Sequence, residues 1–190
     1  MINRIKKIQK ELGKYELDGL IVTNHFNIFY LTGFRGISPL EREALLLITS
    51  KKATLIIARL YQAEAYKIQT SLQGVPLEVQ TADEKGQIHK LVKNALLGLT
   101  KIGFEQSDLK YSEFLEFKKF LKVKKIIGIK HLIEKFRIIK SSEEIKNIKK
   151  AQIISQSAFD EVIKTIKVGQ TEKQIGETLV KIIKSFGGQG

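Results

Sequence analysis

Residues 44–58 read ALLLITSKKATLIIA and hold the strongest fold signal in this chain of 190 residues. Two apolar runs, Ala44–Thr49 and Ala53–Ala58, flank the polar tripeptide at residues 50–52. Short runs rich in Leu and Ile that are bounded by a polar turn are typical of strands that are buried on both faces. The stretch therefore predicts a hairpin of two largely buried strands.

The segments on either side of this hairpin alternate between helical and strand patterns. Before it, apolar residues at helical spacing predict a helix over 3–17, and a short β-rich run predicts a strand over 20–23. Alternation of this kind is typical of an α/β fold in which helices pack on a mixed sheet. After the hairpin, the expected elements are helices over 60–68, 85–99 and 112–121 and strands over 75–80, 102–105 and 125–129.

The pattern changes from about residue 131, where strand signals stop and two long helical patterns follow. Ser141 with Glu144, and Thr171 with Gln174, fit the capping box that begins a helix. Gly169 lies between the two patterns and fits the left-handed residue after a helix.

Two domains are expected, an α/β domain over residues 1–131 and the incomplete start of a second domain over residues 132–190. The two helices of the second domain carry about ten large apolar side chains, each worth roughly 1.5–3 kcal/mol when fully buried. Packing two helices against each other hides only part of this surface. We therefore expect the isolated chain to self-associate or to be loosely ordered in this region.

The formal net charge is +13, with 33 Lys and Arg against 20 Asp and Glu. The lysines are spread along the chain, mostly as pairs, and no basic run carries the interleaved aromatic residues that stack on bases. A solvated lysine-rich surface is therefore preferred over a nucleic-acid interface.

The chain contains no cysteine, which excludes a disulfide framework and a thiolate metal site. Its apolar runs are too short to cross a bilayer, so no membrane partner is expected. The basic start of the chain lacks the apolar segment of a signal peptide. We expect a cytoplasmic protein.

Four segments, in order along the chain, resemble motifs of the creatinase, prolidase and aminopeptidase P family. The first is NIFYLTGF over residues 27–34, and the second is IGFE over residues 102–105. The third is RIIKS with the following Glu-Ile and Lys-Ala over residues 137–151, and the fourth is GQTE with Ile over residues 169–175. Each motif is weak alone, but their common order makes the resemblance specific.

This resemblance implies a mixed-sheet creatinase-type amino-terminal domain, followed by two long helices that open a truncated pita-bread catalytic domain. In that family two Asp, one His and two Glu hold two divalent metal ions, such as manganese, and the metals generate the hydroxide that attacks the peptide bond before proline. No residue of this chain matches those ligands, so no catalytic residue, metal ligand or cofactor is expected in it. The resemblance implies the amino-terminal fragment of an Xaa-Pro aminopeptidase or dipeptidase, inactive alone.

The expected partners are a second copy of the chain in a homodimer or a complementary catalytic-domain polypeptide, with proline-containing peptides as substrates of the complete enzyme. A non-catalytic protein-binding module on a peptidase-like fold is the alternative. One segment departs from the family pattern, because residues 58–61 read ARLY where many members have Asp-x-Arg-Tyr.

Four residues are candidates for a loop that faces the catalytic cleft: His25, Asn27, Tyr30 and Arg35. The first two follow a strand, where open α/β sheets present functional groups, and the resemblance implies a position near the cleft. The alternatives remain that Asn27 only stabilises a turn, that Tyr30 packs in the core and that Arg35 is a solvated surface residue.

Overall fold

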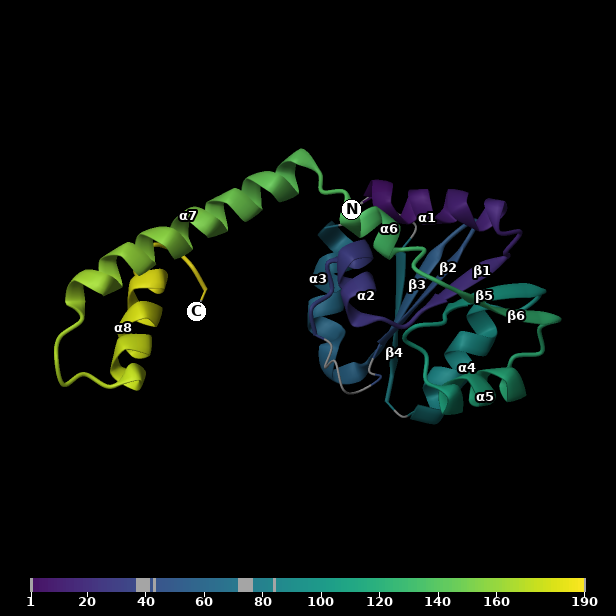
Figure 1. Ribbon diagram of the computed structural model, residues 1–190. Coiled ribbons are helices and arrows are strands. Elements are labelled where there is room, and N and C mark those ends of the chain that lie inside the picture. Colours follow the sequence, from purple (N-terminus) through teal and green to yellow (C-terminus); the bar gives the residue numbers. More distant parts are fainter. Residues whose placement is uncertain (1, 37–41, 43, 72–76, 84, 190) are drawn as a thin grey trace. The chain divides into compact units, whose positions relative to one another are not determined.

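The computed structural model describes residues 2–36, 42, 44–71, 77–83 and 85–189 (Figure 1). The chain divides into two compact units, Met1–Arg137 and Ile138–Gly190. Leu132 and Ile133, which precede the end of the first unit, are buried in its core.

A six-stranded mixed sheet forms the centre of the first unit, with the strand order β4-β3-β2-β1-β5-β6. β2 runs antiparallel to both of its neighbours, whereas the remaining neighbouring pairs are parallel. The predicted α/β fold with a mixed sheet is confirmed, and so is the predicted hairpin of β2 and β3. The strands are β1 (Gly19–Val22), β2 (Ala44–Thr49), β3 (Ala53–Ala58), β4 (Leu77–Ala82), β5 (Lys101–Glu105) and β6 (Lys125–Ile129). Residues 75 and 76 of the strand predicted over 75–80 lie outside the described residues.

Helices cover both faces of this sheet (Figure 1). One face carries α1 (Ile2–Lys14), α2 (His25–Thr32), α3 (Gln62–Ser71) and α6 (Glu134–Ile138), and a short 3-10 helix (Arg59–Tyr61) precedes α3. The other face carries α4 (Lys85–Ala95) and α5 (Tyr111–Phe120).

The continuous apolar runs of the central strands follow from this double coverage. Successive side chains of a strand point to opposite faces, so a strand between two helical layers needs apolar residues at every position. In β2, Leu46 and Ile48 join the core under α1 and α2, while Leu45 and Leu47 join the core under α4 and α5. The sheet therefore lies between two separate hydrophobic cores.

The second unit contains α7 (Ser142–Thr165) and α8 (Glu172–Ser185). Both predicted capping boxes are present, since the side chain of Ser141 accepts from the backbone N–H of Glu144, and that of Thr171 from Gln174. α7 ends at Thr165, and Gly169 adopts the left-handed conformation, with φ of 91°, in the turn to α8.

The two helices of this unit leave much of their apolar surface exposed. Ala158 and Val162 of α7 are buried, but Ile148, Ile153 and Phe159 on the same helix are each more than half exposed. None of the helices in the described part of the chain combines the length and the apolar character that crossing a bilayer requires.

Candidate functional site

The carboxyl ends of β1, β5 and β6 meet at one edge of the sheet, because these neighbouring strands are parallel. The helix after β1 packs on one face of the sheet and the helix after β5 packs on the other. Ligands of open α/β sheets bind in the crevice where the connections diverge in this way. Functional groups are therefore expected at this edge.

Glu105, the last residue of β5, is buried at this edge and accepts hydrogen bonds from three neighbours. Its Oε2 accepts from the backbone N–H groups of Thr23, at 2.6 Å, and Asn24, at 2.7 Å. Its Oε1 accepts from the side-chain amide of Asn27, at 2.6 Å. Burial raises the pKa of the Glu105 carboxyl above its ordinary value, against these hydrogen bonds, which favour the charged form.

Arg42, which lies two residues before β2, forms hydrogen bonds at the same edge. Its Nε and Nη2 donate to the two carboxylate oxygens of Glu113, at 2.8 and 2.9 Å, in a bidentate pair. Its Nη1 donates to Asp108 Oδ2, at 2.7 Å, and to the carbonyl oxygen of Thr23, at 2.6 Å. Burial alone would raise the pKa of Asp108 and of Glu113, but hydrogen bonds, including those from Arg42, outweigh it and lower both pKa values.

A small cavity of about 40 Å³ opens beside Glu105, with Asp108, His131 and Glu134 also in its wall. This volume is comparable to that of one water molecule. Within residues 2–36, 42, 44–71, 77–83 and 85–189, no three His, Asp or Glu side chains converge in a way that could hold a metal ion. The described polar side chains at this edge form a network of hydrogen bonds around Glu105 and Arg42.

A larger hollow, of about 380 Å³, lies at α2 and the residues that follow it. It is lined by His25, Phe26, Phe29, Phe34 and Arg35. The guanidinium carbon of Arg35 lies 5.4 Å from the centre of the Phe29 ring, within the range of a cation–π contact. The hollow therefore combines aromatic surface with one exposed positive charge.

The structure separates the four candidate residues into two pairs. His25 and Arg35 line the hollow, whereas Asn27 is fully buried and bonded to Glu105. Tyr30 is half-buried, and its hydroxyl donates to the carbonyl oxygen of Phe136, at 3.1 Å.

Sequence reasoning missed Arg42, Glu113 and Glu134 as members of the polar network at the sheet edge. Glu105 and Arg137 did carry a signal, since both lie in the family motifs at residues 102–105 and 137–151. Nothing in the sequence around Arg42 indicates that its partners lie 66 and 71 residues further along the chain.

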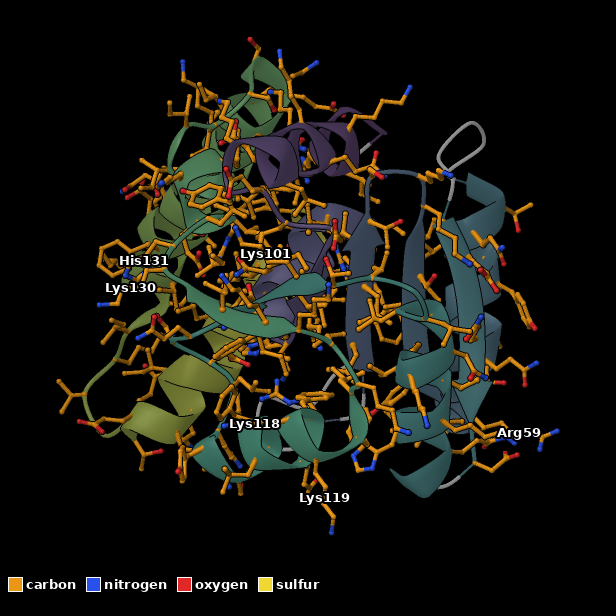
Figure 2. All side chains as sticks on the ribbon, turned by 90° about the vertical axis from the view of Figure 1, so that its right-hand side faces the viewer. Arg59, Lys101, Lys118, Lys119, Lys130 and His131 are labelled. Atoms are coloured by element: carbon orange, nitrogen blue, oxygen red, sulfur yellow. The ribbon has the colours of Figure 1, made fainter. Side chains whose placement is uncertain are left out.

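α5, which carries Glu113 of this network in its first turn, also bears two lysines in its last turn. Lys118 and Lys119 project from α5 (Figure 2), and both are exposed.

Comparisons with known proteins agree with the resemblance seen in the motifs. Residues 4–139 match the family model described as Creatinase/Prolidase N-terminal domain. The chain is 29% identical over 189 residues to a curated Xaa-Pro dipeptidase of Pyrococcus horikoshii. The aligned region covers 100% of this chain and 50% of that protein.

Two solved structures have the same fold. An Xaa-Pro dipeptidase from Bacillus anthracis matches with a TM-score of 0.74 and 29% identity, over 97% of this chain and 48% of that one. An X-Pro aminopeptidase from Thermotoga maritima matches with a TM-score of 0.81 and 24% identity, over 98% of this chain and 50% of that one. The chain spans about half the length of the curated relatives it matches. Since the family match covers residues 4–139, with the sheet and its edge network inside it, the chain belongs to the creatinase/prolidase N-terminal domain family.

Proposed function

We propose that this chain supplies the amino-terminal part of an Xaa-Pro aminopeptidase or dipeptidase, a cytoplasmic enzyme that hydrolyses the bond before proline with two divalent metal ions such as manganese. The observation that carries the proposal is the family match over residues 4–139. The similarity to an Xaa-Pro dipeptidase along the whole chain, over half of that relative, adds to it.

The metal ions of such an enzyme generate a hydroxide from water, which attacks the peptide carbonyl. The described residues of this chain do not fit that role, because none of their His, Asp and Glu side chains form a group that could hold a metal ion. No step of the hydrolysis is therefore assigned to this chain. We propose that it is inactive alone and acts as a homodimer or with a complementary catalytic-domain polypeptide.

The segment from His25 to Arg35 is the part of this chain that we propose faces the catalytic cleft. His25 and Arg35 contribute their side chains there, while Asn27 bonds the segment to Glu105 of β5 and Tyr30 bonds it to Phe136 of α6. Aromatic rings and a guanidinium group suit a proline-containing peptide, because the rings contact the apolar proline ring and the guanidinium pairs with a carboxylate.

The first test is an activity assay of the purified chain on an Xaa-Pro dipeptide with manganese. No turnover above the buffer blank is expected, and metal-dependent turnover would contradict the proposal that the chain is inactive alone. A pull-down with the chain as bait should recover a polypeptide that carries the Asp, Asp, His, Glu and Glu ligands, and mixing the two should produce activity.

The proposed cleft segment is tested in that reconstituted enzyme. Arg35→Ala should raise KM for the dipeptide about tenfold, as expected for the loss of about 1.4 kcal/mol of binding free energy. Arg59→Ala is the matched control, because Arg59 is an exposed arginine that pairs with Asp83 and is not among the residues that line the hollow. Equal effects of the two substitutions would count against a role of Arg35 in binding.

A non-catalytic protein-binding module is the second candidate function. It is favoured by the exposed apolar side chains of Ile148, Ile153 and Phe159 on α7, since exposed apolar surface of this kind marks interaction sites. Recovery in the pull-down of partners that lack the metal ligands, with no peptidase activity on mixing, would support this candidate instead.

A further inference from the structure

β6 forms one end of the six-stranded sheet, since it comes last in the strand order and pairs with β5 along its whole length (Figure 1). A strand in this position carries two rows of backbone N–H and C=O groups, one bonded to its neighbour and one directed outward from the sheet. The outward row is a template for a further strand. The kind of strand that fits depends on the residues of this row and on the side chains around it.

The hydrogen bonds between β5 and β6 identify the residues of the outward row. The N–H of Lys125 donates to the carbonyl oxygen of Thr100, at 3.0 Å, and the carbonyl oxygen of Ile129 accepts from the residue after β5, at 3.2 Å. Every second residue of β6 from Lys125 onward therefore faces β5, because backbone groups of successive strand residues point to alternate sides. The N–H and C=O groups of Ile126 and Gly128 face outward.

The side chains in the middle of β6 lie at the rims of both hydrophobic cores. Ile126 packs against the core under α4 and α5, and Ile127 packs against the core under α1 and α2. Both side chains are only half-buried. A strand added beside β6 would cover their exposed parts, so apolar or β-branched residues suit the middle of that strand.

Lysines flank this apolar middle at both ends. Lys124 and Lys125 stand at the amino end of β6, Lys130 directly follows its carboxyl end (Figure 2), and all three are exposed. One carboxylate, that of Glu16, lies near enough to Lys125 to interact with its charge, but it is bonded to Lys101, at 3.0 Å. The edge is therefore complementary to a strand with acidic residues on both sides of an apolar middle.

The same lysines disfavour a second copy of this chain as the occupant. In an antiparallel pair of two β6 strands centred on Ile127, Lys124 of each copy would lie opposite Lys130 of the other. Like charges directly opposite each other destabilise a strand pair. Lysines on an outer strand protect a sheet against pairing with an identical sheet, but they attract an acidic strand.

We propose that the outer edge of β6 is a binding site for an acidic extended peptide segment, which adds to the sheet beside β6. The backbone groups of Ile126 and Gly128 supply the hydrogen bonds. The flanking lysines select acidic residues on both sides of a middle of five strand residues, which spans about 17 Å. This inference concerns the first unit alone and does not depend on the proposed function.

The test uses the full chain and a fluorescent synthetic peptide with the sequence Glu-Glu-Thr-Val-Thr-Val-Thr-Glu-Glu, and binding is measured by fluorescence anisotropy. The peptide Lys-Lys-Thr-Val-Thr-Val-Thr-Lys-Lys should bind at least tenfold more weakly, because its charges repel the flanking lysines. An acidic peptide that is N-methylated at its five central residues keeps the charges and loses the donors. It should also bind at least tenfold more weakly, because strand addition needs those backbone hydrogen bonds.

Hydrogen exchange of single amides, followed by NMR, locates the bound peptide on the chain. In the free chain, the N–H groups of Ile126 and Gly128 should exchange at least tenfold faster than those of Ile127 and Ile129, which face β5. Saturation with the acidic peptide should slow exchange at Ile126 and Gly128 at least tenfold, and should leave exchange at Ile127 nearly unchanged.

A pair of substitutions at Gly128 tests the outward N–H itself. Gly128→Pro and Gly128→Ala both add a Cβ atom against the flexible side chain of Gln106, but only proline removes the N–H. Proline is tolerated in an outer strand where its nitrogen faces away from the neighbouring strand. Gly128→Pro should therefore bind the acidic peptide about tenfold more weakly than Gly128→Ala.

Charge reversal provides a second test if Gly128→Pro does not fold. Lys124→Glu combined with Lys130→Glu should weaken binding of the acidic peptide about tenfold and strengthen binding of the basic one. Lys90→Glu combined with Lys93→Glu is the matched control, because both lysines are exposed on α4, which packs over β3 and β4, and the net charge changes equally. The control should alter neither affinity.

The proposal is overturned if the acidic peptide does not bind, if the basic peptide binds equally well, or if the two pairs of charge reversals have equal effects. Equal binding of the N-methylated peptide would also overturn it, since charge alone would then hold the probe. Slow exchange at Ile126 and Gly128 in the free chain, equal to that at Ile127, would show that another part of the protein covers this edge and would overturn the proposal as well.

Discussion

Glu105 shows how one buried carboxylate organises the sheet edge at the scale of single residues. Two backbone N–H groups and the amide of Asn27 donate to it, and Asp108 lies close enough to disfavour its charged form. Burial is the largest cause of the raised pKa of the Glu105 carboxyl. Because the folded form then binds the Glu105 proton more tightly than the unfolded chain does, this group makes the free energy of unfolding depend on pH.

The direction of that dependence is testable with Glu105→Gln. The stabilisation from a raised carboxyl pKa is complete below the ordinary value of 4.5 and is lost as the pH rises through the folded-state value. We therefore expect the wild type to gain stability relative to Glu105→Gln as the pH is lowered from 7 to 4.5, by about 1.4 kcal/mol for each unit by which the pKa is raised.

Urea unfolding of both proteins at several pH values measures this difference. Asp108 and Glu113, whose lowered pKa values stabilise the fold at higher pH, are present in both proteins and largely cancel. A stability difference that is constant with pH, or that runs in the opposite direction, would show that the folded-state pKa of Glu105 is not raised.

At the scale of elements, close packing around β5 explains the glycine in its sequence. A Cβ atom on Gly103 would lie 2.7 Å from Leu17 Cδ1 and 3.1 Å from Ile129 Cγ1. Strand glycines of this kind mark places where neighbouring elements approach closely. Gly13 in α1 is the opposite case, because a Cβ atom there would meet nothing within 4 Å.

Alanine substitutions at these two glycines should change the free energy of unfolding in opposite directions. Gly103→Ala should lower the free energy of unfolding by about 1–3 kcal/mol, because the added methyl group overfills the core. Gly13→Ala should raise it by about 0.5–1 kcal/mol, because alanine is the better helix former. Denaturant unfolding followed by circular dichroism measures both changes. A rise in the free energy of unfolding on Gly103→Ala would mean that the packing around Gly103 is looser than the structure shows.

At the scale of the whole molecule, the second unit contrasts with the first. The first unit buries two apolar cores on the faces of its sheet, while α7 and α8 bury little beyond Ala158 and Val162. Ile153 is 66% exposed and Phe159 is 54% exposed. Exposed apolar side chains on one helical unit favour association with another surface.

We therefore expect the isolated chain to self-associate through the second unit at high concentration. Ile153→Glu should weaken this association, and Gln152→Glu is the matched control, because it adds the same charge at the neighbouring exposed position without removing apolar surface. Analytical ultracentrifugation over a hundredfold concentration range measures the effect. A wild-type chain that stays monomeric over that range would contradict the prediction.

Local patterns in the sequence determined much of the fold. The hairpin at residues 44–58, the order of helices and strands and both capping boxes each depend on residues close together in the chain. Short α6 was not predicted, because five residues carry no recognisable period. Gly169 is expected directly after the first long helix, but α7 ends at Thr165, because apolar spacing alone does not fix where a helix stops.

Only the tertiary structure decided which polar residues meet at the sheet edge. Glu105 reaches Asn27 because β1 and β5 are neighbours in the sheet, and Glu134 and Arg137 reach it because α6 returns to the same edge. The physical reason is the separation of the partners along the chain. Hydrophobic periodicity and helix caps involve residues a few positions apart, whereas these hydrogen bonds join partners 78 to 110 residues apart.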